Sequence, residues 1–559
     1  MKKILITTIA IIALASASAQ TNNDALIFEA MQMEMERSMN ELRIDNMPAP
    51  FFIQYIISEG EMIDIRASLG SIISTNHRPK VRSVFARVMT ESNELTNDGQ
   101  FTNQGGFSMA LTIDNDLDQL RRGIWRVSDA NFKFGLEMLT EKRNELRRTT
   151  LSEAEAALLD FHSAEPVEVF VPTHFTHAIN RAELEALSER LSRVFFEFPN
   201  LYATNVTFSA AQSVFYTMTS EGTRTRQPLS QVMIRASALV RATDGAVLND
   251  NIQIIAADLS TLPSEEELMS TIRAFAANLQ ALGNAPLVTD FYNGPVLFEG
   301  EPAVSIFLRS LLSTQGIQAR RRPVVAQQQQ TARNLPIGRR LLDARFTVIN
   351  HTQKTEFNGI PLVGSYHVDA EGIIPEPSLV MIDRGILTNF LNNRIPTEFA
   401  ARSNGNQRIG SNPEQIVTEM RPSVLEIQAT DGVSRQTLRQ QLLDSARDEG
   451  LPYAYIVRQT TGAARIYQVD VETGVETLMR SPNIEQLGIR QLRRVDGVSS
   501  EIIVSHRLLN NFSDTWSNVS AFPISIISPC ALLFQDVEIN IGTVTLETKP
   551  TVANPLLRD

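Results

Sequence analysis

Strand-like and helical segments alternate irregularly along this chain, and this order limits its possible folds more than any other feature. Three strand-like stretches come first, at 51–58, 62–73 and 81–89. Leu69-Gly70-Ser71 is expected to form a bend or bulge within the second of them. Helical patterns then dominate residues 114–160, and a further strand is expected near 234–241. Because no strict strand–helix–strand repeat runs through the chain, the pattern predicts an α+β fold.

Asn293-Gly294-Pro295 marks the expected boundary between two domains. We predict an N-terminal mixed α/β domain over residues 20–292. The domain predicted over 293–559 is mainly β, since short strands and Gly, Pro and Asn turns predominate there. Within it, the basic, Gln-rich stretch 318–340 is interpreted as an exposed surface loop, most simply a solvated linker.

Two helices have clear end signals. Ser264 and Glu267 have the spacing of a capping box, which opens a helix with Leu268 and Ile272 on its apolar stripe. A second helix is expected to end at Gly450 after a start near Arg435.

The first nineteen residues have the three parts of a secretory signal peptide. Lys2 and Lys3 precede the apolar run 4–15, and Ala17-Ser18-Ala19 supplies a small-x-small cleavage site. The run is too short to span about 30 Å of hydrocarbon. We therefore predict cleavage after Ala19, release to the periplasm or the extracellular medium, and no stable membrane insertion afterwards.

Charge and cysteine content exclude two further classes of protein. The chain has 51 Lys and Arg against 63 Asp and Glu, a formal net charge of −12. Nucleic-acid binding needs a basic footprint, so no nucleic-acid partner is expected. Cys530 is the only cysteine, so no intramolecular disulfide can form, and the thiol is interpreted as a small buried hydrophobe.

Several segments occur in an order that is known from one family. The strongest is Phe357–Gly372, which contains Gly-Ser-Tyr-His-Val-Asp-Ala-Glu-Gly. The others are Thr219–Thr223, Tyr292–Leu297, Leu379–Ile382, Gly385–Leu387, Asn393-Arg394, Ser403–Asn406, Gly450–Arg458 and Ala531–Phe534. Together they resemble the TldD/PmbA family, whose members carry a Gly-Ser-Tyr-x-Val-Asp-Asp-Glu-Gly block followed by the same order of segments. The resemblance implies a TldD/PmbA-like fold.

Catalytic members of that family are similar to zinc peptidases with a His-Glu-x-x-x-His helix. Two imidazoles on one helical face hold the metal, and the carboxylate is the general base. The resemblance places these three positions on Leu308, Arg309 and Ser313, none of which can take over the role. The apolar residues of this helix instead recur at i, i+3, i+4, i+7 and i+8, which predicts a buried packing face. No histidine occurs between Pro295 and Asn350. No zinc or other cofactor is therefore expected in this chain.

Other side chains could still bind a metal or a peptide. His367, Asp369 and Glu371 alternate along a predicted strand, so all three could point to one face. His174 and His177 lie three residues apart, but a surface or capping role suits them better. The candidates for a peptide groove are Tyr366, His367, Asp369, Glu371, Arg394 and Asn404.

Three hypotheses for function remain open at this stage. The favoured one, which rests on the resemblance, is a non-catalytic PmbA-type subunit. It would form a homodimer, or a heterodimer with a metal-bearing TldD-like subunit, around a chamber that receives peptide. The second is an active metallopeptidase with a rearranged site, built from His367, Asp369, Glu371 or distant histidines. The third is a secreted binding or scaffold protein that keeps only the fold.

Overall fold

A computed structural model of the chain describes residues 23–97, 107–173, 175, 177–313, 316–321, 336–459, 465–509, 521–544, 546 and 555. The predicted signal peptide, most of the Gln-rich stretch and His174 lie outside these residues. The beginning of the Gln-rich stretch is described, and it is not exposed: Gln318 and Ala319 are buried. The Gln318 Nε2 group donates to the carbonyl oxygen of Met420 at 2.6 Å, which holds the chain there.

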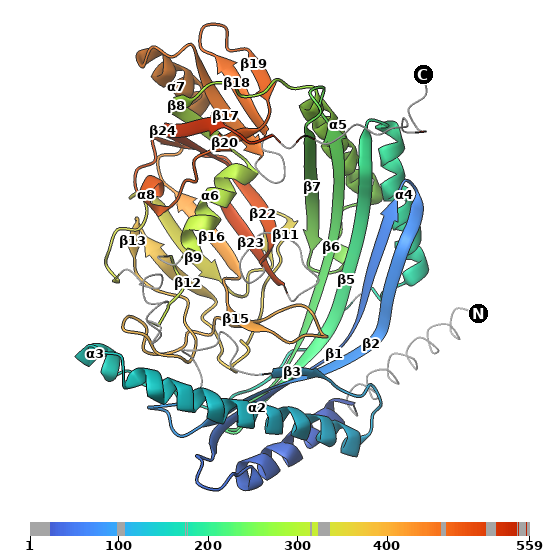
Figure 1. The fold of residues 1–559 in the computed structure, drawn as a ribbon, viewed down its shortest axis with the longest axis vertical. Helices are drawn as coiled ribbons and strands as arrows, with labels where there is room; N and C mark the ends of the chain where they lie inside the picture. Colours follow the sequence, from blue (N-terminus) through green and yellow to red (C-terminus); the bar gives the residue numbers. More distant parts are fainter. Residues whose placement is uncertain are drawn as a thin grey trace.

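Most of the first half folds into one long, curved sheet of seven strands (Figure 1). Its order is β3-β2-β1-β5-β6-β4, and β7 also pairs with β6. The strands are β1 (Pro50–Ser68), β2 (Ser71–Thr90), β3 (Phe107–Ala110), β4 (Glu168–Phe170), β5 (Leu201–Thr219), β6 (Arg224–Arg241) and β7 (Val247–Ala256). All neighbours are antiparallel except β4 and β6.

Two of the expected local features differ in the structure. Leu69 and Gly70 do not bend a strand but form the two-residue turn between β1 and β2, with Ser68 paired to Ser71. Their φ angles are 47° and 71°, as a tight hairpin turn of this length requires. The expected strand near 234–241 is the second half of β6, which already begins at Arg224.

The helices of this half cover one face of the long sheet. They are the helix over residues 23–41, α2 (Leu117–Leu146), α4 (Arg181–Arg193) and α5 (Glu265–Gly283). Because strand side chains alternate, Ile53 and Tyr55 of β1 meet the first two helices, while Ile63 and Ile65 meet α4 and α5. The Ser264 capping box of α5 is present, which confirms that prediction. The shorter helices of this half are α3 (Glu153–Ala156), η1 (Val194–Glu197) and η2 (Leu259–Thr261). The short helix α8 (Ile489–Leu492) belongs to the second half.

The second half contains two further large sheets. One has six strands in the order β13-β12-β9-β16-β23-β22, and the other has the order β19-β18-β17-β8-β24-β20, with β21 also paired to β24. The first comprises β9 (Phe346–His351), β12 (Ser378–Asp383), β13 (Ile386–Leu387), β16 (Val424–Ala429), β22 (Ile502–Leu509) and β23 (Phe522–Pro529). The second comprises β8 (Tyr292–Glu299), β17 (Tyr453–Gln459), β18 (Arg465–Asp470), β19 (Glu476–Met479), β20 (Pro482–Ile484), β21 (Gly497–Val498) and β24 (Ala531–Ile541).

The largest apolar core of the molecule lies between these two sheets, around α6 (Glu301–Leu311). A second helix, α7 (Arg435–Asp448), packs with β8, β17 and β24 in a smaller core that also buries Cys530. The interpretation of this thiol as a buried hydrophobe is thereby confirmed. Two short hairpins complete this half: β10 (Glu356–Phe357) with β11 (Ile360–Pro361), and β14 (Gln407–Ile409) with β15 (Thr418–Met420).

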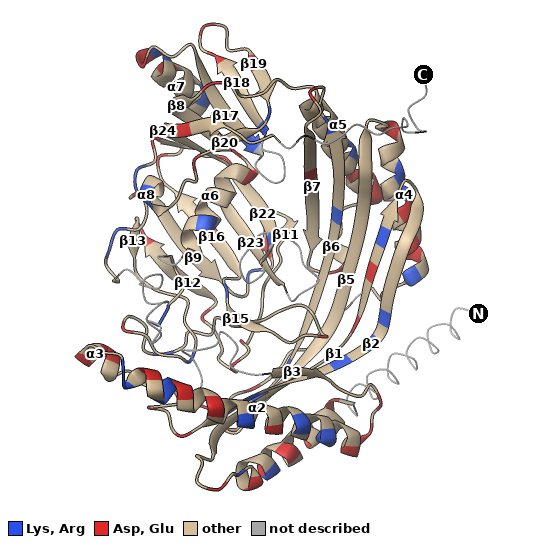
Figure 2. Cartoon of the chain, in the orientation of Figure 1, with Lys and Arg blue, Asp and Glu red and all other residues tan. Residues whose placement is uncertain are grey.

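These elements confirm the α+β class, with a mainly β second half. Charged side chains follow the helices, α2 above all, whereas the strands of the two C-terminal sheets carry few of them (Figure 2). Among the helices that the structure describes, none combines the length and the apolar character needed to span a membrane.

The face of the long sheet opposite its helices packs against the second half of the chain (Figure 1). Ile56, Phe85 and Phe215 form an apolar cluster with Ala370 and Ile416. Hydrogen bonds surround this cluster. Ser58 Oγ donates to the Pro413 carbonyl at 2.5 Å, and Ser83 Oγ donates to the Glu414 carbonyl at 2.8 Å.

Two ion pairs join the first half to the region of β18 and β19 in the C-terminal sheet that contains β8. Arg465 Nη2 lies 2.6 Å from Asp250 Oδ2, and both side chains are almost fully buried. Arg480 Nη2 lies 2.6 Å from Asp244 Oδ2 in a more exposed position. Burial raises the pKa of Asp250 to about 6, whereas the Arg480 hydrogen bond lowers the pKa of Asp244.

The raised pKa makes a prediction about stability against pH. The folded chain holds a proton on Asp250 at a pH where the unfolded chain, with an ordinary pKa of 3.8, has lost it. This group therefore stabilises the fold most below pH 3.8, and that contribution is lost as pH rises through about 6. Urea unfolding of wild type and Asp250→Asn between pH 4 and 7 should show the difference moving in the variant's favour by about 2 kcal/mol.

The Asp244→Asn variant is the control of opposite sign. Because its pKa is lowered, Asp244 contributes stability that is present at neutral pH and lost only as pH falls through the folded pKa. A difference between wild type and Asp250→Asn that stays constant over the whole pH range would contradict the raised pKa of Asp250.

Candidate functional site

Helix α6 holds the three positions that the resemblance assigns to metal ligation. Gly300, at φ 68°, precedes the helix, and Pro302 lies in its first turn. Leu308 is 4% exposed and belongs to the core between the two C-terminal sheets. Arg309 is exposed, and Ser313 Oγ donates to the Ser310 carbonyl at 2.8 Å.

The apolar stripe predicted on this helix is confirmed. Val304, Phe307 and Leu311 are buried with Leu308, and the Phe307 ring meets Phe346 of β9 edge-on at 5.1 Å between centroids. At the family's first ligand position, therefore, an aliphatic side chain completes the core. Neither it nor the neighbouring guanidinium can donate an electron pair to a metal.

The Gly364–Gly372 block is a loop that ends in a turn, so the expectation that His367, Asp369 and Glu371 alternate along a strand is wrong. His367 is exposed, while Asp369 and Glu371 are buried. Asp369 accepts hydrogen bonds from the backbone N–H groups of Glu371, Ile373 and Gln407 at 2.8–3.2 Å. Burial and the Glu371 carboxylate raise the pKa of Asp369 against these three donors.

Glu371 joins the two halves of the chain through a buried ion pair. Its Oε1 atom lies 2.7 Å from Nη1 of Arg87 on β2, and both side chains are less than a tenth exposed. Its Oε2 atom accepts from the backbone N–H of Arg394 at 2.8 Å. The carboxylate is thus shared between the long sheet and a loop of the second half.

Arg394 makes the next link of the same network. Its Nη2 atom lies 2.7 Å from Glu221 Oε1, and its Nε atom donates to the His162 carbonyl at 2.8 Å. The guanidinium lies over the ring of Phe161 at 4.1 Å and over that of Phe52 at 4.9 Å. Cation–π contacts of this kind are strengthened when the cation is desolvated, and Arg394 is 1% exposed.

Tyr366 and Asn404 hold the adjoining loops together. Tyr366 Oη donates to the Gly405 carbonyl at 2.7 Å, and its ring lies under the guanidinium of Arg408 at 5.4 Å. Burial lowers the pKa of Arg408 to about 10. Asn404 Oδ1 accepts from the backbone N–H of Asn392 at 2.8 Å, and Asn404 Nδ2 donates to the Phe390 carbonyl at 2.6 Å.

Segments that the resemblance singled out separately therefore meet in space. Glu221 belongs to the first of them and binds Arg394 of a later one. Gly372, at φ 78°, turns the chain against Thr223, where an added Cβ would lie 2.4 Å from Thr223 Cγ2. These segments form a buried joint between the two halves of the molecule. Of the six groove candidates, Glu371 and Arg394 bind the first half through this joint, and Tyr366, Asp369 and Asn404 are hydrogen-bonded within the second half. Only His367 is exposed, and a role for the six in binding peptide stays a prediction.

The described histidines do not gather into a metal site elsewhere in the molecule. His77 contacts Glu61 at 2.7 Å on β2, His351 contacts Glu426 at 3.0 Å on β9, and His506 contacts Ser525 at 3.0 Å on β22. Over the ranges described above, no group of three or more His, Cys, Asp or Glu side chains could together hold a metal ion.

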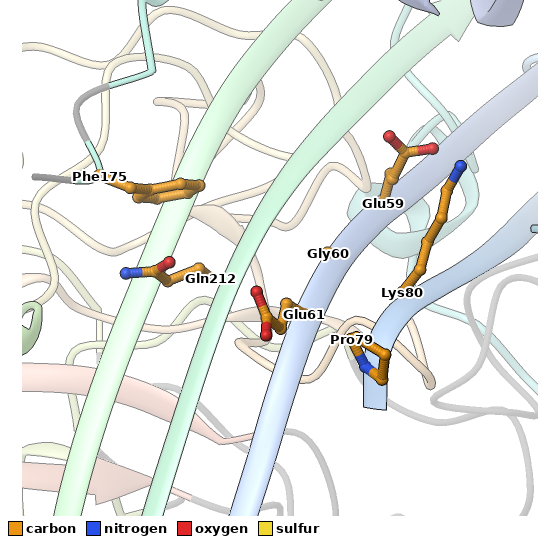
Figure 3. Close-up of a pocket in the computed structure, with 7 residues that line it drawn as sticks. All are labelled: Glu59, Gly60, Glu61, Pro79, Lys80, Phe175 and Gln212. Carbon is orange, nitrogen blue, oxygen red and sulfur yellow. The ribbon is translucent and has the colours of Figure 1, made fainter. Parts of the chain in front are cut away.

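A hollow of about 300 Å³ opens on the long sheet, far along the chain from α6 (Figure 3). It lies at a bulge, because Gly60 pairs with Val81 and Met62 with Arg78, leaving Pro79 and Lys80 opposite Glu61. Its lining is Glu59, Gly60, Glu61, Pro79, Lys80, Phe175 and Gln212. The two carboxylates are bound to Arg82 and His77, so the hollow is mixed in charge.

Sequence reasoning missed two members of the joint. Arg87 lies in an ordinary strand pattern, and Phe161 follows a helical region in a segment without regular structure. No local signal identifies either residue, since Arg87 reaches Glu371 from 284 positions away. Glu221 carried a signal, because its turn was among the segments that resemble the family.

Comparisons with known proteins agree with this architecture. Residues 293–482 match the family model described as the PmbA/TldA metallopeptidase C-terminal domain. The chain is similar to a modulator of DNA gyrase from Bacteroides thetaiotaomicron (11% identity, 92% of this chain and 98% of that chain covered, TM-score 0.55). It is also similar to one from Thermotoga maritima (11%, 88% and 96%, 0.54) and to TldE from Thermococcus kodakarensis (12%, 88% and 96%, 0.52). None of the curated proteins matches the chain.

These three structures share the overall fold of the chain, in which a long helix-covered sheet packs against a second half with a two-sheet core around α6. Residues 293–482 carry the C-terminal domain of the TldD/PmbA family. This finding confirms the resemblance that the separate sequence segments carried.

Proposed function

We propose that this chain is a secreted, non-catalytic subunit of the PmbA type, which binds unfolded peptide beside a metal-bearing TldD-like partner. The observation that carries the proposal is the packing of Leu308 into the core at the family's first ligand position. Arg309 adds a positive charge where the peptidase chemistry needs a general base.

The buried joint supports the same proposal. Arg87, Glu371, Arg394 and Glu221 hold the helix-covered sheet against the second half of the chain, so both halves present one rigid surface. A rigid wall built from sheets suits a protein that takes extended peptide by strand addition. The secretory signal expected over residues 1–19 supports a function outside the cytoplasm.

Reconstitution with a partner tests the proposal. The mature chain, purified from the periplasm with Gln20 as its first residue, should bind unfolded peptide without cutting it. Addition of a TldD-like chain with an intact His-Glu-x-x-x-His helix from the same organism should give a complex that cleaves the peptide, and chelation should abolish cleavage. A matched reaction with the partner's two histidines replaced provides the control.

Two outcomes would reject the proposal. Cleavage by the chain alone that chelation stops would make it an active metallopeptidase. Failure to bind peptide, either alone or with the partner, would leave only a scaffold role.

A further inference from the structure

Part of the long sheet presents a row of polar side chains on the side facing the second half of the chain. Arg66, Thr207, Arg235 and Gln253 are paired in register across β1, β5, β6 and β7. Directly paired residues point to the same face of a sheet. We call these four residues the arginine row.

The side of the sheet is known from Met233, which lies two residues before Arg235. Met233 is buried against Val363, Leu508 and Ala521 of the second half. The arginine row borders this contact without being covered by it: Arg66 is exposed, and the other three residues are partly exposed. A ligand can therefore reach the row beside the packed region.

Arg235 lacks the partner that a half-buried guanidinium needs. Its Nε atom is inaccessible to solvent and has no hydrogen-bond acceptor among the described residues. Burial lowers the pKa of Arg235, with no opposing charge to raise it. Leaving a buried charged donor unsatisfied costs stability, and such a group calls for a bound anion or water.

Arg66 also keeps donors available for a ligand. Its Nε atom donates to Asn205 Oδ1 at 2.9 Å. The nearest acid along the strand, Asp64, accepts from Ser209 Oγ at 2.5 Å and is not paired with Arg66. The adjacent register row, Asn205, Ser237 and Asn251, is uncharged and can both donate and accept hydrogen bonds.

We propose that the arginine row binds a carboxylate of the peptide that the protein holds, with Arg235 as the main contact and Arg66 as the second. This proposal rests on the proposed function and names a chemical preference within it. Guanidinium groups pair with carboxylates through parallel hydrogen bonds, and the surrounding amides and hydroxyls suit peptide backbone. The acidic chain as a whole gives no comparable attraction for nucleic acid.

Peptide binding to the full mature chain tests the arginine row. One neutral labelled peptide is made as the free acid and as the C-terminal amide, each with and without a single glutamate. Wild type should bind the carboxylate-bearing forms about tenfold more tightly than the neutral amide, and Arg235→Gln and Arg66→Gln should each reduce that preference. Comparison of the two forms with a single carboxylate, the free acid without glutamate and the amide with glutamate, identifies whether the terminus or the side chain is the source. Arg126→Gln, at an exposed position of α2, should retain the preference.

The outcomes separate this inference from the proposed function. Equal affinity for all four peptides, or an unchanged preference in both variants, would contradict carboxylate binding by the arginine row. Peptide binding itself would be unaffected by that result. No binding of any peptide would remove the proposed function and the row together. Should Arg235→Gln fail to fold, the exposed Arg66→Gln variant decides alone, since its side chain contributes little to packing.

Discussion

Replacement of Arg394 by alanine should lower the free energy of unfolding by about 3–5 kcal/mol, because it breaks a buried ion pair and leaves its partner uncompensated. Glu221 would lose the guanidinium at 2.7 Å, and Phe161 and Phe52 would lose the cation above their rings. Urea denaturation followed by tryptophan fluorescence and far-UV circular dichroism measures the change.

Arg273 provides a matched control for this variant. It binds Glu197 through two hydrogen bonds of 2.7 and 2.8 Å, but both side chains are nearly half exposed. Arg273→Ala should therefore cost no more than about 1 kcal/mol. Equal losses in the two variants would mean that the joint between the halves is no more important than a surface ion pair.

Leu308→Ala is expected to destabilise the fold by about 2–5 kcal/mol through the cavity that it leaves in the core around α6. The side chain is 4% exposed and lies among residues from both C-terminal sheets, so little rearrangement can fill the space. Thermal and urea unfolding should both detect the loss. The loss of stability comes from packing and not from metal ligation, so added zinc or chelator should leave it unchanged.

The next residue along the helix is the control for this experiment. Arg309 is exposed, and alanine is a good helix former, so Arg309→Ala should stay within about 0.5 kcal/mol of wild type. A Leu308→Ala variant with an unchanged free energy of unfolding would show that α6 is loosely packed, and it would contradict the packing role of Leu308.

Local sequence signals predicted the elements that depend on residues close together in the chain. The Ser264–Glu267 capping box and the apolar stripe of α6 depend on residues a few positions apart, and both are present. The turn at Leu69-Gly70 was misread because β1 and β2 are 19 and 20 residues long. Ordinary strands are much shorter, so the sequence pattern suggested breaks that this hairpin does not contain.

The joint between the two halves could not be predicted in the same way. Arg394 and Glu221 are 173 positions apart, and Arg87 and Glu371 are 284 apart. Arg87 looks like an ordinary polar residue of a strand, and no local signal pairs Glu221, Glu371 or Arg394 with its distant partner. Asp369 and Glu371 resembled ligands because carboxylates two apart often share a face, but a turn ending at Gly372 directs them into the interior instead.

The central claim is that the family's metal helix has become a packing element in this chain. The most direct test is the zinc content of the purified mature protein after incubation with zinc and exhaustive dialysis, measured together with peptidase activity. We expect no stoichiometric zinc and no change in melting temperature when chelator is added. One tightly bound zinc per chain, with peptidase activity that chelation removes, would contradict the account.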